Sequence, residues 1–224
     1  MLNLIFQDDF LCVIDKPSGL PVHRDHFSPR AEPVCLQILR DQINTKVFPV
    51  HRLDRGTSGV LIFALNQESH RKLSIDWMNG GVQKVYHGVV RGKLPERIEC
   101  HDALRDEGIL RQATTVFDRV SYSEFPISNE RFPSSRYTLA KIIPQQGRYH
   151  QIRRHANHLG YPLVGDTTHG DSDHNRIWSE HFGIKRLLLH CSEITLQHPE
   201  TDKSITFRAG LPTDLTKKFS IPCQ

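Results

Sequence analysis

The sequence has few cysteines, no long hydrophobic run and no signal for export. Its five cysteines are odd in number and widely spaced, without a Cys-x-x-Cys pair, which argues against a disulfide framework and a zinc ribbon. The longest uninterrupted apolar run, residues 60–65, is far too short to cross a membrane. Acidic residues stand near the N-terminus, where a secretory signal peptide needs basic ones. We therefore expect a cytoplasmic protein with no membrane association.

Phosphate-binding and metal-binding motifs are also missing. Neither the G-x-G-x-x-G nor the G-x-x-x-x-G-K-[ST] pattern occurs, which argues against nucleotide-dependent enzymes. Three histidines, His150, His155 and His158, lie close together, but their spacings of five and three residues do not match the i, i+4 pair of helical zinc sites. We expect no metal site.

The length of 224 residues fits one domain, or two lobes that share a core. The net charge of +4 is modest, so that charge alone only hints at a nucleic-acid partner. The distribution of the charges is more informative. Arginines gather around residues 52–55 and 148–154, whereas acids gather elsewhere, which favours a local positive site facing a phosphate backbone.

Hydrophobic spacing predicts a mixture of helices and strands without a regular βαβ rhythm. Asn66 is a helix cap and Gly80-Gly81 a helix stop. Loops are expected at residues 23–33 and, with one short helix, at 165–185, while residues 93–133 show no clear pattern. The predicted helices are residues 34–43, 67–78 and 149–159, and the predicted strands are residues 4–6, 11–14, 60–65, 84–92, 135–143, 186–191, 194–197 and 204–208.

The segment Val50-His-Arg-Leu-Asp-Arg-Gly-Thr-Ser-Gly-Val-Leu-Ile-Phe-Ala64 places one carboxylate, Asp54, in a basic loop just before an apolar strand. Arg52 and Arg55 flank Asp54 and favour its ionised form, while Gly56 and Gly59 permit a tight turn of the backbone or its close approach to a ligand. An ionised and positioned carboxylate can act as a nucleophile or a base. An aspartate beside arginine in a turn is, however, more often a salt-bridged loop residue.

Four segments give the chain a resemblance to one family. His51-Arg-Leu-Asp-Arg-Gly-Thr-Ser-Gly59 resembles the active-site signature of the RluA-type pseudouridine synthases, in which the aspartate is the catalytic nucleophile. The other segments are Phe10-Leu-Cys-Val-Ile-Asp-Lys-Pro-Ser-Gly-Leu-Pro-Val-His23, Gln83-Lys-Val-Tyr-His-Gly-Val-Val-Arg-Gly92 and Gly147-Arg-Tyr-His-Gln-Ile-Arg153. Gly160-Tyr-Pro-Leu-Val-Gly-Asp166 and Arg186-Leu-Leu-Leu-His190 complete the resemblance, which extends over nearly the whole chain.

The resemblance implies roles for single residues. Asp54, Tyr86 and Arg153 would form the catalytic group, with Tyr86 stacked on the uracil and Arg153 in a salt bridge to Asp54. Arg52 would replace the target base in its stack, and Leu189 would line the uracil pocket. Plainer readings stay open for Tyr86 as a strand aromatic, for Arg153 as a solvated helix residue and for Leu189 as core.

The remaining implications concern the fold, the partners and the substrate. The resemblance implies an α+β, mixed α/β pseudouridine synthase fold, with a largely antiparallel sheet in two lobes, helices packed on it and a central cleft. Residues 1–224 would be a single catalytic domain without an N-terminal S4 domain, and no cofactor and no protein partner would be needed. RNA is the expected partner, and a basic loop with Lys16, His23 and Arg24, together with Arg55, is a candidate RNA contact.

Among the family's branches, the short one that isomerises uridine-65 of tRNA is the most similar. A ribosomal-RNA synthase, or a protein of the same fold that binds or folds RNA without catalysis, remains an alternative. A glycosidase acting on free nucleosides would need a second carboxylate as general acid, and no acidic residue stands out for that task.

Overall fold

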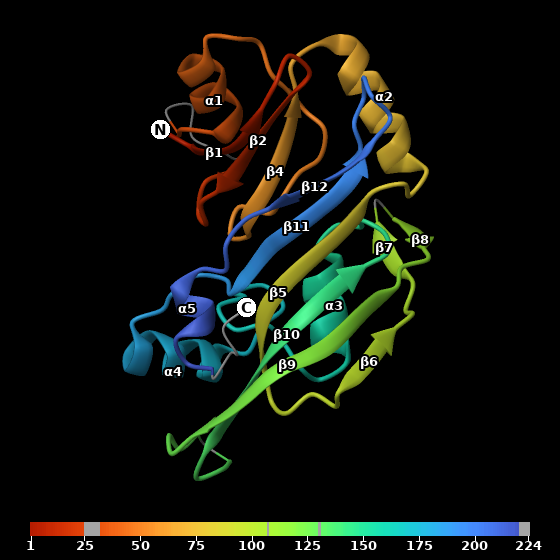
Figure 1. Ribbon diagram of the computed structural model, residues 1–224. Helices are drawn as coiled ribbons and strands as arrows, with labels where there is room; N and C mark the ends of the chain where they lie inside the picture. The colour runs from red at the N-terminus through yellow and green to blue at the C-terminus, as the bar shows by residue number, and fades with distance from the viewer. Residues whose placement is uncertain (25–31, 107, 130, 220–224) are drawn as a thin grey trace. The chain divides into compact units, whose positions relative to one another are not determined.

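The structure of the protein, a computed structural model, describes residues 1–24, 32–106, 108–129 and 131–219 (Figure 1). The chain forms two compact units. Unit 1 comprises Met1–Lys84 and Cys191–Gly210, and unit 2 comprises Val85–His190 and Leu211–Gln224. Within the described residues, no helix combines the length and the apolar character that crossing a membrane requires.

Unit 1 is built on an antiparallel sheet in which β1, β2 and β4 are successive neighbours, β3 pairs with β4 and β12 pairs with β11. Helix α2 packs against β3 and β4. Every residue of β4 is buried, which matches its unbroken apolar sequence. The elements are β1 (Asn3–Gln7), β2 (Leu11–Lys16), α1 (Cys35–Ile43), β3 (Phe48–Pro49), β4 (Ser58–Ala64), α2 (Gln67–Met78), β11 (Leu189–Gln197), whose first two residues belong to unit 2, and β12 (Ser204–Arg208).

Unit 2 contains the antiparallel strand order β5-β10-β9-β6 and a separate small hairpin, β7-β8. The strands β9 and β10 form a long hairpin, drawn in green in Figure 1. The elements are β5 (Gln83–Arg91), β6 (Arg97–Cys100), β7 (Leu104–Asp106), β8 (Ile109–Arg111), β9 (Thr115–Phe125), β10 (Ser135–Pro144), α3 (Gln151–His158), α4 (Ser172–Phe182) and α5 (Thr213–Thr216).

Two hydrophobic clusters cover opposite faces of the unit 2 sheet. Val90 of β5 lies in the cluster to which α3 contributes Ile152 and Ala156. Its neighbour Val89 lies in the other cluster, with Trp178 of α4 and Leu215 of α5. Since successive residues of a strand point to opposite faces, the alternation predicted for residues 84–92 is confirmed.

The predicted bounds of three helices and six strands lie within two residues of the observed bounds of α1, α2, α3, β1, β2, β4, β5, β10 and β12. The sequence does not predict α5 or the strands β3, β6, β7, β8 and β9. Helix α2 begins after Asn66, whose side chain accepts a hydrogen bond from the Ser69 N–H at 2.8 Å, as the capping prediction requires. The prediction of separate strands at residues 186–191 and 194–197 is wrong, because β11 is one strand that begins at Leu189. Its polar middle continues the strand since Glu193 pairs with Arg208 of β12 at 2.7 Å.

Candidate active site

The loop that carries Asp54 is held against β4 in unit 1. The Val50 N–H donates to the carbonyl of Ile62 at 3.3 Å, and the Ile62 N–H donates in turn to Nε2 of His51 at 3.1 Å. A side chain thus takes the place of a backbone carbonyl at the end of the β3–β4 ladder. Beyond this anchor the chain turns, and the Thr57 N–H bonds to the carbonyl of Asp54 at 3.0 Å. Asp54 is half-buried.

Gly59 ends the loop under a steric constraint. Its φ of +109° is a conformation that side chains rarely adopt, and a Cβ there would lie 2.1 Å from the carbonyl oxygen of Cys191. The close approach that glycine permits at this position is therefore to the backbone of Cys191. Gly59 is the second residue of β4, which starts at Ser58, four residues after Asp54.

Lys16 joins the Asp54 loop to the turn that follows β2. Its ammonium donates to the carbonyls of Pro17, Leu20 and Arg55 at 2.9, 2.7 and 3.2 Å, and the residue is 0% exposed. The expectation that Lys16 belongs to a basic surface loop is therefore wrong. In the interior of unit 1, these backbone carbonyls replace water as hydrogen-bond acceptors of the ammonium and so stabilise its charge.

The two arginines beside Asp54 differ in their surroundings. Arg52 is exposed. The guanidinium of Arg55 lies 2.6 Å from the carboxylate of Glu32 and also donates to the carbonyl of Gly19 at 3.1 Å. Arg55 therefore helps to hold the loop, although its side chain keeps a solvent-exposed surface.

Tyr86, Arg153 and Leu189 all belong to unit 2, and Tyr86 and Leu189 share one hydrophobic cluster. Tyr86 is half-buried and packs against the cluster that contains Leu189 and Ile152, the residue before Arg153. Leu189 is buried, with 3% of its surface exposed, and it packs in the hydrophobic core of unit 2.

Arg153 forms a buried ion pair with Asp166. Its Nε and Nη2 atoms each lie 2.7 Å from a carboxylate oxygen, and the side chains are only 9% and 1% exposed. Asp166 also accepts the N–H groups of Thr168 and His169, at 2.9 and 3.0 Å. Burial alone would raise the pKa of Asp166, but the hydrogen bonds from Arg153 and the two N–H groups outweigh it and lower that pKa.

Asp166 is a site residue that was given no role from the sequence. Asp166 is the last residue of the segment Gly160–Asp166, and the sequence of this segment does not indicate that Asp166 pairs with Arg153. The turn around it is tight, because a Cβ on Gly165 would lie 1.9 Å from the carbonyl oxygen of Arg186. Asn175 braces the same turn, since its side chain accepts from the Gly165 N–H at 2.7 Å and donates to the carbonyl of Asp166 at 2.9 Å.

Comparison with known proteins identifies the family. A family model described as RNA pseudouridylate synthase matches residues 10–158 of the chain. The chain belongs to this family. It is 40% identical over 223 residues to the tRNA pseudouridine synthase C of Vibrio cholerae serotype O1, covering 94% of this chain and 91% of the relative. The protein of the same name from Pasteurella multocida is 38% identical, covering 94% and 91%.

Solved structures support the pseudouridylate synthase fold. The human RNA pseudouridylate synthase domain containing 1 superposes with a TM-score of 0.77, at 20% identity, over 99% of this chain and 89% of its own. The human RNA pseudouridylate synthase domain containing 4 superposes with a TM-score of 0.74, at 20% identity, over 99% of this chain and 95% of its own. The predicted mixed α/β fold with a largely antiparallel sheet is therefore confirmed.

Other residues singled out from the sequence are placed as follows. His23 and Arg24 are exposed, and Arg24 contacts the side chain of Gln37 at 3.2 Å, while the rest of the expected loop, residues 25–31, lies outside the described residues. The ring nitrogens of His155 lie 2.9 Å from Thr115 Oγ1 and 3.0 Å from the carbonyl of Asp102. Across the described parts of this pseudouridylate synthase, no three His, Cys, Asp or Glu side chains cluster as metal ligands would.

His51 is held in its neutral form by its surroundings. Its ring is stacked on Trp77, with ring centroids 4.3 Å apart and an interplanar angle of 13°. Burial and the nearby Lys84 ammonium lower the pKa of His51 from 6.5 to about 3. Only a neutral ring leaves Nε2 able to accept from Ile62.

Replacing His51 with leucine should lower the free energy of unfolding by about 1–3 kcal/mol at pH 7, because the Ile62 N–H loses its acceptor. Between pH 6.5 and about 3, the unfolded chain binds a proton at this histidine that the folded chain does not, so that acid removes the wild-type advantage. The difference between wild type and His51→Leu should therefore shrink as the pH falls from 7 to 4 in urea titrations. A control variant, His181→Leu at an exposed position, should show no such convergence.

Proposed function

We propose that this protein is an RNA pseudouridine synthase that isomerises a specific uridine of tRNA. The observation that carries the proposal is the Asp54 motif, held in a fixed loop, within a chain that matches enzymes named tRNA pseudouridine synthase C over 94% of its length. We further propose uridine-65 as the target, as the resemblance of the sequence to that branch of the family implies.

The reaction breaks the C1′–N1 glycosidic bond of the uridine, turns the uracil and joins its C5 to C1′, while the proton on C5 leaves to solvent. Asp54 supplies the negative charge that the electron-poor C1′ needs, either as a covalent nucleophile or as the base and electrostatic partner in a glycal route. No metal or organic cofactor is needed for this step, because the uracil anion is delocalised and must only be retained in the site.

Tyr86 and Arg153 complete the proposed catalytic group. Tyr86 is half-buried and packs against the apolar cluster, and we assign its ring to stacking on the uracil and its hydroxyl to proton movement. Asp166 fixes the orientation of Arg153 within unit 2. The salt bridge from Arg153 to Asp54 is proposed from the resemblance to the family. On this proposal, the two units act as one catalytic domain.

Substrate binding would use exposed basic side chains and one apolar residue. Arg52, exposed beside Asp54, is proposed to fill the space left by the unstacked uridine, which offsets part of the unstacking cost of a few kcal/mol. Arg55, His23 and Arg24 would contact phosphates, and Leu189 would line the uracil pocket.

Release of tritium from RNA labelled with [5-³H]-uridine tests this function. We expect release from an unmodified tRNA transcript with uridine at position 65 and none from the same transcript with cytidine there. Pseudouridine mapping of total RNA from cells with and without the protein then shows the natural target. A difference in ribosomal RNA but not in tRNA would replace the tRNA proposal, and no difference in any RNA would refute the enzyme.

A further inference from the structure

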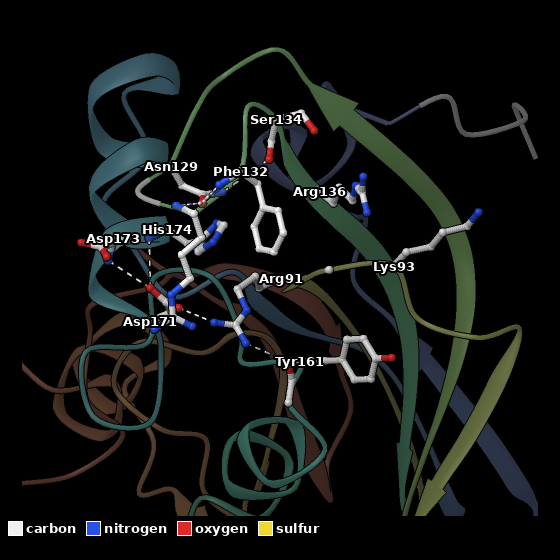
Figure 2. A pocket seen from close by; sticks show the side chains of 13 residues that line it. Arg91, Lys93, Asn129, Phe132, Ser134, Arg136, Tyr161, Asp171, Asp173 and His174 are labelled. Carbon is white, nitrogen blue, oxygen red and sulfur yellow. Dashed lines mark hydrogen bonds and ion pairs between the residues drawn. The ribbon is translucent and has the colours of Figure 1, made fainter.

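Unit 2 contains a cavity of about 570 Å³ at the end of β5 that is remote from Tyr86 (Figure 2). Its wall includes Arg91, the last residue of β5, which stands five positions after Tyr86. At about 3.4 Å per residue, the two lie roughly 17 Å apart along the strand. The loop that joins β9 to β10 and the start of α4 supply the other walls. No role proposed above uses this cavity.

The exposed charge of the cavity is positive. Arg91 is neutralised in the wall, since its guanidinium pairs with Asp171 and donates to the carbonyl of Gly160 at 3.1 Å. Asp173 lies 3.4 Å from Arg176. The acidic side chains of the lining are thus each beside an arginine. Three further cations are exposed around the cavity, namely Lys93, Arg131 and Arg136.

Two of these cations, Lys93 and Arg136, are only weakly engaged within the protein. Arg136 lies 3.2 Å from Glu124 in a surface pair whose side chains are 57% and 41% exposed, and such pairs contribute little. The ammonium of Lys93 lies 5.1 Å from the centre of the Tyr122 ring. Their charges therefore remain able to attract an anion.

An exposed aromatic ring projects into the same cavity. Phe132 is 62% exposed, and Figure 2 shows its ring pointing into the space between the loop and Arg91. The backbone beneath it is fixed, because Asn129 Oδ1 accepts the N–H groups of Arg131 and Phe132, each at 3.0 Å. The Asn129 N–H also donates to the carbonyl of Phe132 at 2.9 Å. These bonds hold the backbone at Phe132, so that its apolar ring faces the cavity.

We propose that this cavity binds a second, unpaired nucleotide of the RNA substrate, distant from the uridine that is isomerised. Its base stacks on Phe132, and its flanking phosphates contact Lys93, Arg131 and Arg136. A rigid aromatic ring surrounded by cations is the arrangement with which proteins hold single-stranded RNA, because every base has a face to stack and every nucleotide a phosphate. This inference rests on the proposed function, which makes RNA the substrate.

Substitution of Phe132 tests the stacking. Phe132→Ala should weaken binding of the unmodified tRNA transcript by about 5- to 100-fold, as loss of one base–aromatic stack does. Phe132→Trp keeps a stacking surface and should bind within about threefold of wild type. Because the side chain is largely exposed, both variants should fold, which thermal unfolding verifies. The losses should appear both in the dissociation constant and in kcat/KM.

Removal of charge tests the phosphate contacts. The double variant Arg131→Gln and Arg136→Gln should lower the magnitude of the slope of log affinity against log salt by about 1.4 to 1.8, since each phosphate contact contributes about 0.7 to 0.9. A double variant of Lys185→Gln and Lys217→Gln removes the same charge from exposed positions of unit 2 outside the cavity. It should leave the slope within about 0.5 of wild type.

The outcomes separate this inference from the proposed function. Wild-type affinity in Phe132→Ala, or an equal loss in Phe132→Ala and Phe132→Trp, would overturn the second nucleotide site while leaving the enzyme intact. A wild-type protein that binds tRNA through Phe132 but releases no tritium would overturn the proposed function and leave this site standing.

Discussion

Replacing Asp54 with asparagine is expected to lower the rate of uridine isomerisation by at least about 10³-fold while RNA binding and the fold persist. The amide is nearly isosteric with the carboxylate, but it has neither its charge nor its nucleophilicity. The turn should survive, because the Thr57 N–H bonds to the backbone carbonyl of Asp54 and not to its side chain. Single-turnover tritium release measures the rate, and filter binding measures the affinity.

Arg52→Gln serves as the matched control for Asp54→Asn, because it changes an exposed side chain two residues away in the same loop. It should weaken RNA binding while retaining measurable chemistry once the RNA is bound. Substantial turnover in Asp54→Asn would contradict the nucleophile assignment.

Replacing Arg153 with methionine is expected to destabilise the protein by about 3–5 kcal/mol, because it leaves the carboxylate of Asp166 buried without its cation. Denaturant unfolding at pH 7 measures this loss. Asp166 has a lowered pKa, so its contribution is present above the ordinary pKa of 3.8 and is lost as the pH falls through the folded-state value. The stability difference should therefore narrow only in strong acid.

A double variant, Arg153→Met with Asp166→Leu, separates the structural role of Arg153 from the catalytic one. Removing both charges should restore much of the lost stability, since an apolar pair of similar size is often no less stable than a buried ion pair. If Arg153 also orients Asp54, turnover should stay low in this stable variant. Recovery of turnover would show that Arg153 acts only through the fold.

Arg154, the half-buried neighbour of Arg153, supplies a further comparison. Arg153→Lys keeps the charge but loses the planar fork that reaches both oxygens of Asp166, so that turnover should fall while RNA affinity changes little. Arg154 turns away from this pair and donates to the carbonyl of Arg105 at 3.1 Å. Arg154→Lys should therefore leave turnover largely intact.

Local signals made part of the fold predictable. Helix α2 was predictable because its cap, Asn66, and its stop, Gly80, are neighbours of the helix in the sequence. The strands within residues 93–133 were not, because β9 is only partly buried along its outer half and its alternation is correspondingly weak. Its stability as a strand comes from pairing with β10, which sequence periodicity does not report.

The site was predictable only as far as single motifs extend. Asp54, Tyr86 and Arg153 could be chosen from the sequence, but the partner of Arg153, thirteen residues away, could not. Lys16 was misplaced for a related reason. Lysines are almost always exposed, so that the sequence predicts an exposed Lys16. Lys16 is buried because the carbonyls of Leu20 and Arg55, which are far apart in the sequence, both accept hydrogen bonds from its ammonium.

The missing side chain at Gly59 bears on how sequences of this kind should be interpreted. The backbone of Cys191 occupies the space that any other residue would need, so that β4 and β11 admit glycine alone at this position. A protein that kept this architecture and lost the chemistry would keep the glycine all the same. Within the motif, Gly59 therefore reports the architecture, and the presence of Asp54 is what distinguishes an enzyme from an inactive relative.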